Sequence, residues 1–209
     1  MTAPPWIPLA LCFFSTFAIA TGAEGPAMSA ADSPMHALKE HDLAVQSILD
    51  STGADSLDAT VRRRIKSHIN ATFDFNELSK LSLGPHWAER SSIEQQHFVS
   101  VFSGIIQEQN FESFLRYYRE SEISYQDEQI DSTVATVNAL VPLKAERVEI
   151  TYHLHRTGGE WRVYDLLIDG ASTAAGHRRR HIRYIAKYSY ERLVEQLEKQ
   201  LTRLMGGNS

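Results

Sequence analysis

The chain has 209 residues, a length that suits one domain with its own hydrophobic core. Hydrophobic residues make up 43% and charged residues 22%, which is the balance of a globular protein and excludes a largely disordered chain. The net charge of −5 gives no support for nucleic-acid binding. The single cysteine, Cys12, excludes an intramolecular disulfide and a cysteine-rich metal site.

Residues 1–23 are predicted to be a secretory signal peptide. An almost uninterrupted apolar run covers residues 7–20, which is short for a bilayer span, and small residues suited to cleavage end at Ala20 and Ala23. Residues 1–6 contain no Lys or Arg, so the positive charge usual in such a leader rests on the α-amino group alone. A retained membrane anchor is therefore the alternative.

The rest of the chain is predicted to be one exported, periplasmic domain. Residues 24–32 are rich in Ala, Gly and Pro and are expected to form a flexible leader, and residues 33–209 form the domain. A lipoprotein is disfavoured, because Cys12 follows Leu11 where a small residue is needed.

Four helices are predicted first, from capping residues and apolar spacing. Ser33 before Pro34 begins the first helix, and Ser56 begins the second. The next two begin with capping boxes, in which a polar N-cap is followed three residues later by Glu. The two pairs are Asp74 with Glu77 and Ser91 with Glu94. The last helix is the longest, and its apolar positions continue from Phe98 to Tyr118.

From about residue 122 the apolar period changes from 3.6 to 2, which indicates strands. The expected strands cover residues 122–129, 132–143, 146–155 and 161–168. Two further helices are expected, one after Ser172 and one after Ser189. The fold class is therefore α+β, with a helical N-terminal half and C-terminal helices packed on a curved antiparallel sheet of about four strands.

Five segments of the chain form a recognisable set. They are Phe73-Asp74-Phe75-Asn76-Glu77-Leu78-Ser79, Leu83-Gly84-Pro85-His86-Trp87, Glu94-Gln95-Gln96-His97-Phe98-Val99, Trp161-Arg162-Val163-Tyr164-Asp165-Leu166-Leu167-Ile168-Asp169-Gly170-Ala171-Ser172, and residues 188–193. In this order, behind a signal peptide, they resemble the MlaC family, the periplasmic toluene-tolerance auxiliary proteins of lipid ABC transporters. The similarity extends roughly from Ser33 to Leu204. The chain departs from the family at Ala171, where Val is usual, and at Gly176-His177-Arg178, where Asn-Tyr-Arg is usual.

The resemblance implies a periplasmic lipid carrier that is not an enzyme and uses no cofactor. Such a carrier would hold the acyl chains of a phospholipid in an apolar pocket between the sheet and the helices. It would exchange the lipid between an inner-membrane ABC transporter bearing MCE domains and an outer-membrane lipoprotein complex, with transient membrane contact. A carrier of another lipid, such as a hopanoid, is the alternative within this class.

Ten side chains are candidates for the pocket wall, although the same pattern also suits an ordinary core. They are Phe75, Leu78, Leu83, Trp87, Phe98, Phe102, Ile150, Tyr152, Trp161 and Tyr164. The densest basic run contributes Arg178, Arg179, Arg180 and Arg183. These arginines suit contact with lipid phosphates or an acidic partner, and equally suit a solvated helix face.

A serine hydrolase is the alternative from a different class, because residues 170–174 have the spacing of a nucleophile elbow. That motif needs a parallel sheet and the chain order serine, acid, histidine. Here the sheet is predicted to be antiparallel, and no histidine follows Glu191, the first acid after Ser172. We therefore interpret Ser172 as a helix N-cap. Asp165 and Asp169 share a strand face only if no bulge intervenes, and we assign them no chemistry.

A metal-dependent hydrolase is suggested by two histidine pairs with the spacing of zinc ligands. His153 and His155 share one face of a strand, and His177 and His181 lie four residues apart on a helix. Neither pair has a third ligand in an evident position. The polar faces of an amphipathic strand and a basic helix explain both pairs without a metal.

Overall fold

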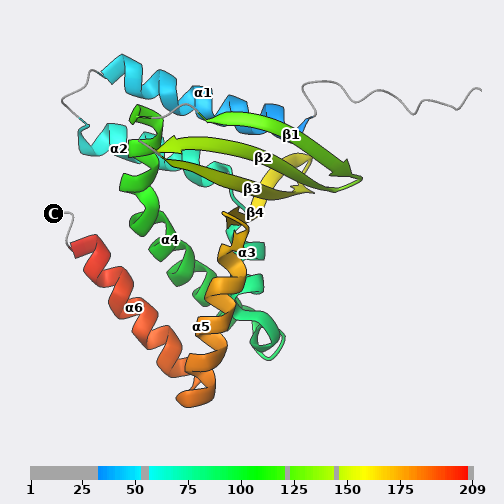
Figure 1. The fold of residues 1–209 in the computed structure, drawn as a ribbon. Coiled ribbons are helices and arrows are strands. Elements are labelled where there is room, and N and C mark those ends of the chain that lie inside the picture. The colour runs from blue at the N-terminus through cyan, green and yellow to red at the C-terminus, as the bar shows by residue number, and fades with distance from the viewer. Residues whose placement is uncertain (1–32, 53–56, 121–122, 144–145, 207–209) are drawn as a thin grey trace, which may run out of the picture.

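A computed structural model of the chain describes residues 33–52, 57–120, 123–143 and 146–206 (Figure 1). The helices are α1 (Pro34–Thr52), α2 (Ala59–Ala71), α3 (Phe75–Leu83), the short 3-10 helix η2 (Gly84–Trp87), α4 (Ser92–Glu120), α5 (Thr173–Lys187) and α6 (Tyr190–Gly206). The strands are β1 (Ser124–Asp131), β2 (Val134–Leu143), β3 (Glu146–Thr157), β4 (Glu160–Ile168) and β5 (Ala171–Ser172). The predicted α+β class is confirmed. The predicted signal peptide (1–23), leader (24–32) and N-cap Ser56 lie outside the described residues.

The described strands form one antiparallel sheet in the order β1-β2-β3-β4-β5, in which each strand pairs with its neighbours along the chain. Four of them are the expected strands. The turn between β1 and β2 comes later than expected, at Ser132, whose φ of 56° lies in the left-handed region. The fifth, β5, was not predicted, because two residues are too few to show a periodic pattern.

Strand β4 carries a bulge at Tyr164. His153 of β3 pairs with Asp165 and the next residue of β3, Leu154, pairs with Val163, so Tyr164 has no residue opposite it. A bulge shifts the alternation of side chains by one residue. The side chains on the covered face of the sheet are therefore Trp161 and Val163 before the bulge, and Leu166 and Ile168 after it.

The outer edge of β4 is covered by two other segments. The Asp74 N–H donates to the Val163 carbonyl (2.8 Å), and the Val163 N–H donates to the Thr72 carbonyl (2.9 Å). Further along, β5 pairs with Leu167 and Ile168. These backbone bonds attach the linker between α2 and α3 to the sheet.

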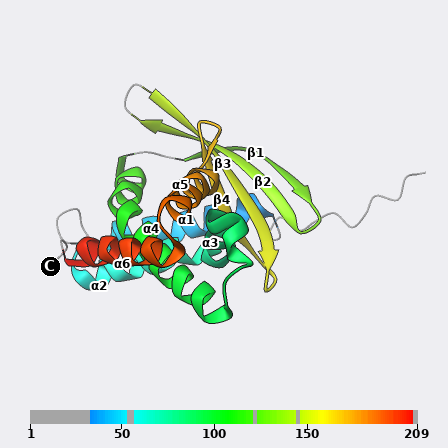
Figure 2. The same cartoon turned by 90° about the horizontal axis from the view of Figure 1, so that it is seen from below.

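Helix α4 takes part in two hydrophobic cores. Its first half contributes Phe98, Phe102 and Ile105 to a core shared with α3, α5 and α6. Its second half contributes Phe111 and Leu115 to a core shared with α1 and α2. A third core joins the start of α1 to the covered face of the sheet. In Figures 1 and 2, α4 runs from the side of the sheet to the corner formed by α5 and α6.

The predicted N-caps are confirmed where the structure describes them. The Ser91 N–H donates to Glu94 Oε2 (2.8 Å) and the Glu94 N–H donates to Ser91 Oγ (3.3 Å), which is a complete capping box. Asp74 and Ser172 cap α3 and α5, whereas the prediction for α2 is wrong, because its N-cap is Asp58 rather than Ser56. Among the described helices, none offers the long apolar stretch that a bilayer crossing requires.

Replacing Asp74 with Ala is expected to lower the free energy of unfolding by about 2 kcal/mol. The substitution removes the cap of α3 and also the hydrogen bond between Asp74 Oδ2 and His155 Nε2 (2.9 Å). Asp58→Ala is the matched control, because it removes only an exposed cap and should cost about 1 kcal/mol. Urea denaturation measures both. A loss in Asp74→Ala no larger than that in Asp58→Ala would show that the His155 contact contributes nothing.

Candidate functional site

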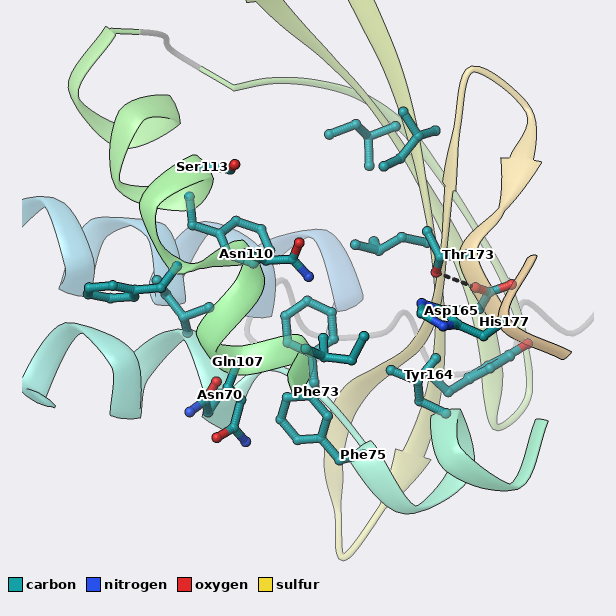
Figure 3. Close-up of a pocket in the computed structure, with 18 of the residues that line it drawn as sticks. Asn70, Phe73, Phe75, Gln107, Asn110, Ser113, Tyr164, Asp165, Thr173 and His177 are labelled. Carbon is teal, nitrogen blue, oxygen red and sulfur yellow. Dashed lines mark hydrogen bonds between the residues drawn. The ribbon is translucent and has the colours of Figure 1, made fainter. Parts of the chain in front are cut away.

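A cavity of about 300 Å³ lies between the sheet and the helices (Figure 3). Its apolar lining consists of Ile69, Phe73, Phe75, Leu78, Ile106, Phe111, Phe114, Val148, Ile150, Leu166 and Ile168. Its polar lining consists of Lys66, Asn70, Gln107, Asn110, Ser113, Tyr164, Asp165, Thr173 and His177. The cavity is therefore bounded by α2, α3, the middle of α4, β3, β4 and the start of α5.

A smaller cavity of about 60 Å³ adjoins the first. The two cavities share Ile69, Phe73, Phe114, Ile150 and Leu166 as lining residues. The rings of Phe73 and Phe114 lie 6.4 Å apart between centroids and are tilted by 48°. Because both rings line both cavities, a change in their rotamers would alter the boundary between the two spaces.

A carboxylate lies at the wall of the smaller cavity. Tyr118 donates a hydrogen bond to Asp42 Oδ1 (2.7 Å), and Tyr125 donates one to Asp42 Oδ2 (2.6 Å). Burial raises the pKa of Asp42 above its ordinary value, and the two hydrogen bonds oppose that change. Burial also raises the pKa of Tyr125 and of Tyr152, so their hydroxyl groups stay protonated.

Asp165 organises the start of α5. Its buried carboxylate accepts hydrogen bonds from Ser172 Oγ (2.5 Å), Thr173 Oγ1 (3.0 Å) and the Ala174 N–H (2.9 Å). Ser172 Oγ in turn accepts from the Ala175 N–H (3.0 Å), which confirms its interpretation as the N-cap. The geometry of this corner is that of a helix start rather than of a serine nucleophile.

The two histidine pairs make other contacts than metal ligation. His181 Nδ1 bonds to a backbone carbonyl at the end of α3 (3.0 Å), and His155 Nε2 bonds to Asp74. Burial, with a smaller contribution from the nearby Arg180 guanidinium, lowers the pKa of His177 and of His181 to about 4, so both rings are uncharged at neutral pH. Within the described ranges, no three His, Cys, Asp or Glu side chains are grouped as metal ligands.

The structure places the ten candidate wall residues in three settings. Phe75, Leu78, Ile150 and Tyr164 line the larger cavity, and Ile150 and Tyr152 line the smaller one. Four others are buried in hydrophobic cores, namely Leu83, Phe98, Phe102 and Trp161, and Trp87 packs against the core shared by α3, α4, α5 and α6. Sequence reasoning missed the rest of the lining. One feature of the sequence could have indicated the cavity: Gln107 and Asn110 are polar residues that interrupt the apolar positions in the middle of α4.

The four arginines of the basic run lie on the exposed side of α5, the helix that begins at the cavity. None of the four lines the larger cavity. Arg178 lies over Gly84, and Arg180 bonds to the ring of His177 (2.8 Å). In the part of the chain that the structure describes, none of the four guanidinium groups forms an ion pair, so their charge is available to an external anion.

Comparisons with known proteins agree with this architecture. A solved structure of a phospholipid-binding protein from Ralstonia solanacearum, in complex with a phospholipid, has a TM-score of 0.68 to this chain at 19% sequence identity. The similarity covers 81% of this chain and 97% of the other, and at this identity it supports the shared fold. No curated protein matches the chain in sequence. The family model of the MlaC protein matches residues 41–199, which include every residue that lines the larger cavity, and the chain therefore belongs to the MlaC family.

Proposed function

We propose that this protein is a non-catalytic carrier that binds the acyl chains of a phospholipid in the larger cavity. The observation that carries the proposal is the convergence of two sequence motifs of the family on this one space. Phe75 and Leu78 reach it from the first motif, and Tyr164, Leu166 and Ile168 reach it from the second. The phospholipid bound to the Ralstonia solanacearum protein, which has the same fold, supports the same ligand class.

A protein cavity is physically necessary for such transport. Moving the chains of a phospholipid with about thirty methylene groups into water costs roughly 25 kcal/mol of free energy, at about 0.8 kcal/mol for each group. A carrier must therefore offer an apolar wall, as this cavity does over most of its lining. Its affinity must also stay close to that of a bilayer, because a much tighter site would not release the lipid.

The size of the cavity indicates how the lipid would fit. At about 300 Å³ it lies at the lower end of ligand pockets, which span roughly 300–1,000 Å³. A two-chain lipid needs more space than this. We propose that Phe73 and Phe114 turn on binding, so that an acyl chain extends into the smaller cavity toward Asp42.

Replacing Leu166 with Trp is expected to remove most of the lipid that co-purifies with the protein. The larger side chain would fill space at the wall shared by both cavities, at a stability cost of about 1–3 kcal/mol. Leu167→Trp is the matched control. Leu167 follows Leu166 on β4, points to the opposite face of the sheet and lines neither cavity. Native mass spectrometry with lipid extraction measures the bound fraction. Equal lipid content in the two variants would contradict the proposed site, and a wild-type protein free of lipid would contradict the function.

Replacing Phe114 with Ala is expected to shift the bound lipids toward longer acyl chains. The change removes a ring from the partition between the cavities and should lower the free energy of unfolding by about 3 kcal/mol. The control is Phe98→Ala, in the core at the other end of α4. It should lower the free energy of unfolding by as much without altering the acyl-chain length of the bound lipids. Mass spectrometry of extracted lipids provides the comparison. The same analysis identifies a hopanoid or another lipid if the ligand is not a phospholipid.

We further propose that the carrier works in the periplasm after export by its signal peptide. In line with its family, it would exchange lipid with an inner-membrane ABC transporter bearing MCE domains and with an outer-membrane lipoprotein complex. The exposed arginines of α5 support contact with an anionic surface, because they are unpaired cations on a chain of net charge −5. The contact would place the start of α5, and therefore the cavity, beside the membrane or the partner.

Replacing Arg178, Arg179 and Arg183 together with Gln is expected to weaken binding to vesicles that contain phosphatidylglycerol by roughly 100-fold, at about 1 kcal/mol for each cation. The affinity of the variant should also depend less on salt, and its lipid content should not change. Arg192→Gln is the control, because that cation is already paired with Glu195 at 2.8 Å. Vesicle co-sedimentation at several salt concentrations tests this, and unchanged binding by the triple variant would show that α5 is not the docking face.

A further inference from the structure

Three amide side chains line the helix side of the cavity, together with Lys66 and Ser113. Asn70 lies at the end of α2, and Gln107 and Asn110 lie in the middle of α4. In Figure 3 all three lie on the side of the cavity opposite Tyr164 and His177, and Asn110 points into the space between the two sides. The helix side of the cavity therefore presents several amide groups among apolar side chains, with Asn70 and Gln107 together and Asn110 apart from them.

These amides are partly buried and still have hydrogen-bonding capacity. Each carries two N–H donors and a carbonyl acceptor. Among the described residues, the side chains of Asn70, Gln107 and Asn110 make no hydrogen bond. Their polar atoms are not fully shielded from solvent, so the amides can donate to a ligand that enters the cavity. The arrangement is thus suited to a ligand that brings hydrogen-bond acceptors to this depth.

The charges near the amides are already compensated. Lys66 Nζ lies 2.7 and 2.8 Å from the two carboxylate oxygens of Glu108 and also lies 4.9 Å from the centre of the Phe111 ring. Across the cavity, the carboxylate of Asp165 is occupied by hydrogen bonds from the start of α5. The His177 ring is uncharged at neutral pH. The three amides therefore match a neutral acceptor better than a phosphate anion.

We infer that Asn70, Gln107 and Asn110 form a binding site for the ester carbonyl groups that join the acyl chains to glycerol. The inference rests on the proposed function, since it assumes an acyl lipid in this cavity. The amide N–H groups donate to the ester carbonyls, and the charged headgroup stays outside this site. The protein then selects its ligand by the ester linkage and accepts zwitterionic and anionic headgroups alike.

Ether lipids test this directly, because an ether oxygen replaces the ester and removes its carbonyl. Delipidated protein would be given equal amounts of diacyl and dialkyl phosphatidylethanolamine of matched chain length, and native mass spectrometry would measure the two complexes. Wild-type protein should favour the diacyl lipid by roughly tenfold, as expected for one or two net hydrogen bonds. Diacyl phosphatidylglycerol should compete equally with diacyl phosphatidylethanolamine.

A triple variant locates the preference. Asn70→Leu, Gln107→Leu and Asn110→Leu together should bind both lipids with a ratio near one, because Leu keeps the volume and removes the donors. Gln109→Leu is the control, since Gln109 is exposed on the same helix and does not line the cavity, and its ratio should match the wild type.

The outcomes separate the inference from the function on which it rests. Equal binding of diacyl and dialkyl lipid by wild-type protein, or an unchanged ratio in the triple variant, would overturn the ester site and leave lipid carriage intact. A preference that follows the headgroup rather than the linkage would overturn it as well. Binding of neither lipid would overturn the proposed function together with the inference.

Discussion

Helix α4 is held at both ends by separate cores, and this constraint keeps the cavity open. Its first half is packed with α3, α5 and α6, and its second half with α1 and α2. The distance along the helix axis from Ile105 to Phe111 is roughly 9 Å at 1.5 Å for each residue. Because protein interiors are packed as densely as crystals, α4 cannot move toward the sheet without disrupting one core or the other. The middle of the helix therefore faces a space that the fold does not close.

The opposite wall depends on one irregularity in the sheet. The bulge at Tyr164 directs Asp165 toward the start of α5 and Leu166 into the cavity. Without the extra residue, the alternation of β4 would turn Leu166 and Ile168 away from the covered face. A single inserted residue thus serves two purposes, since it directs the Asp165 carboxylate to the first residues of α5 and forms the apolar wall that faces α4.

The local features of this fold were predictable from the sequence, and its cavity was not. The caps at Asp74, Ser91 and Ser172 depend on residues within three positions of one another, so short patterns reveal them. Phe98 and Phe114, by contrast, are both apolar positions of α4, and only the elements packed against each half of the helix distinguish core from cavity wall. The bulge at Tyr164 and the strand β5 have no periodic signature, because they interrupt a pattern rather than repeat one.

The backbone bonds along β4 have a consequence for a protein whose core is partly unfilled. An exposed strand edge is a template on which other chains can add as strands, and a loosely filled interior increases that hazard when its ligand is absent. Here the linker before α3 and the strand β5 occupy the edge of β4, while the opposite edge strand, β1, carries acidic side chains at Asp127, Glu128 and Asp131. One edge of the sheet is thus closed by hydrogen bonds and the other carries like charges, and both features oppose edge-to-edge association of the chain when the cavity is empty.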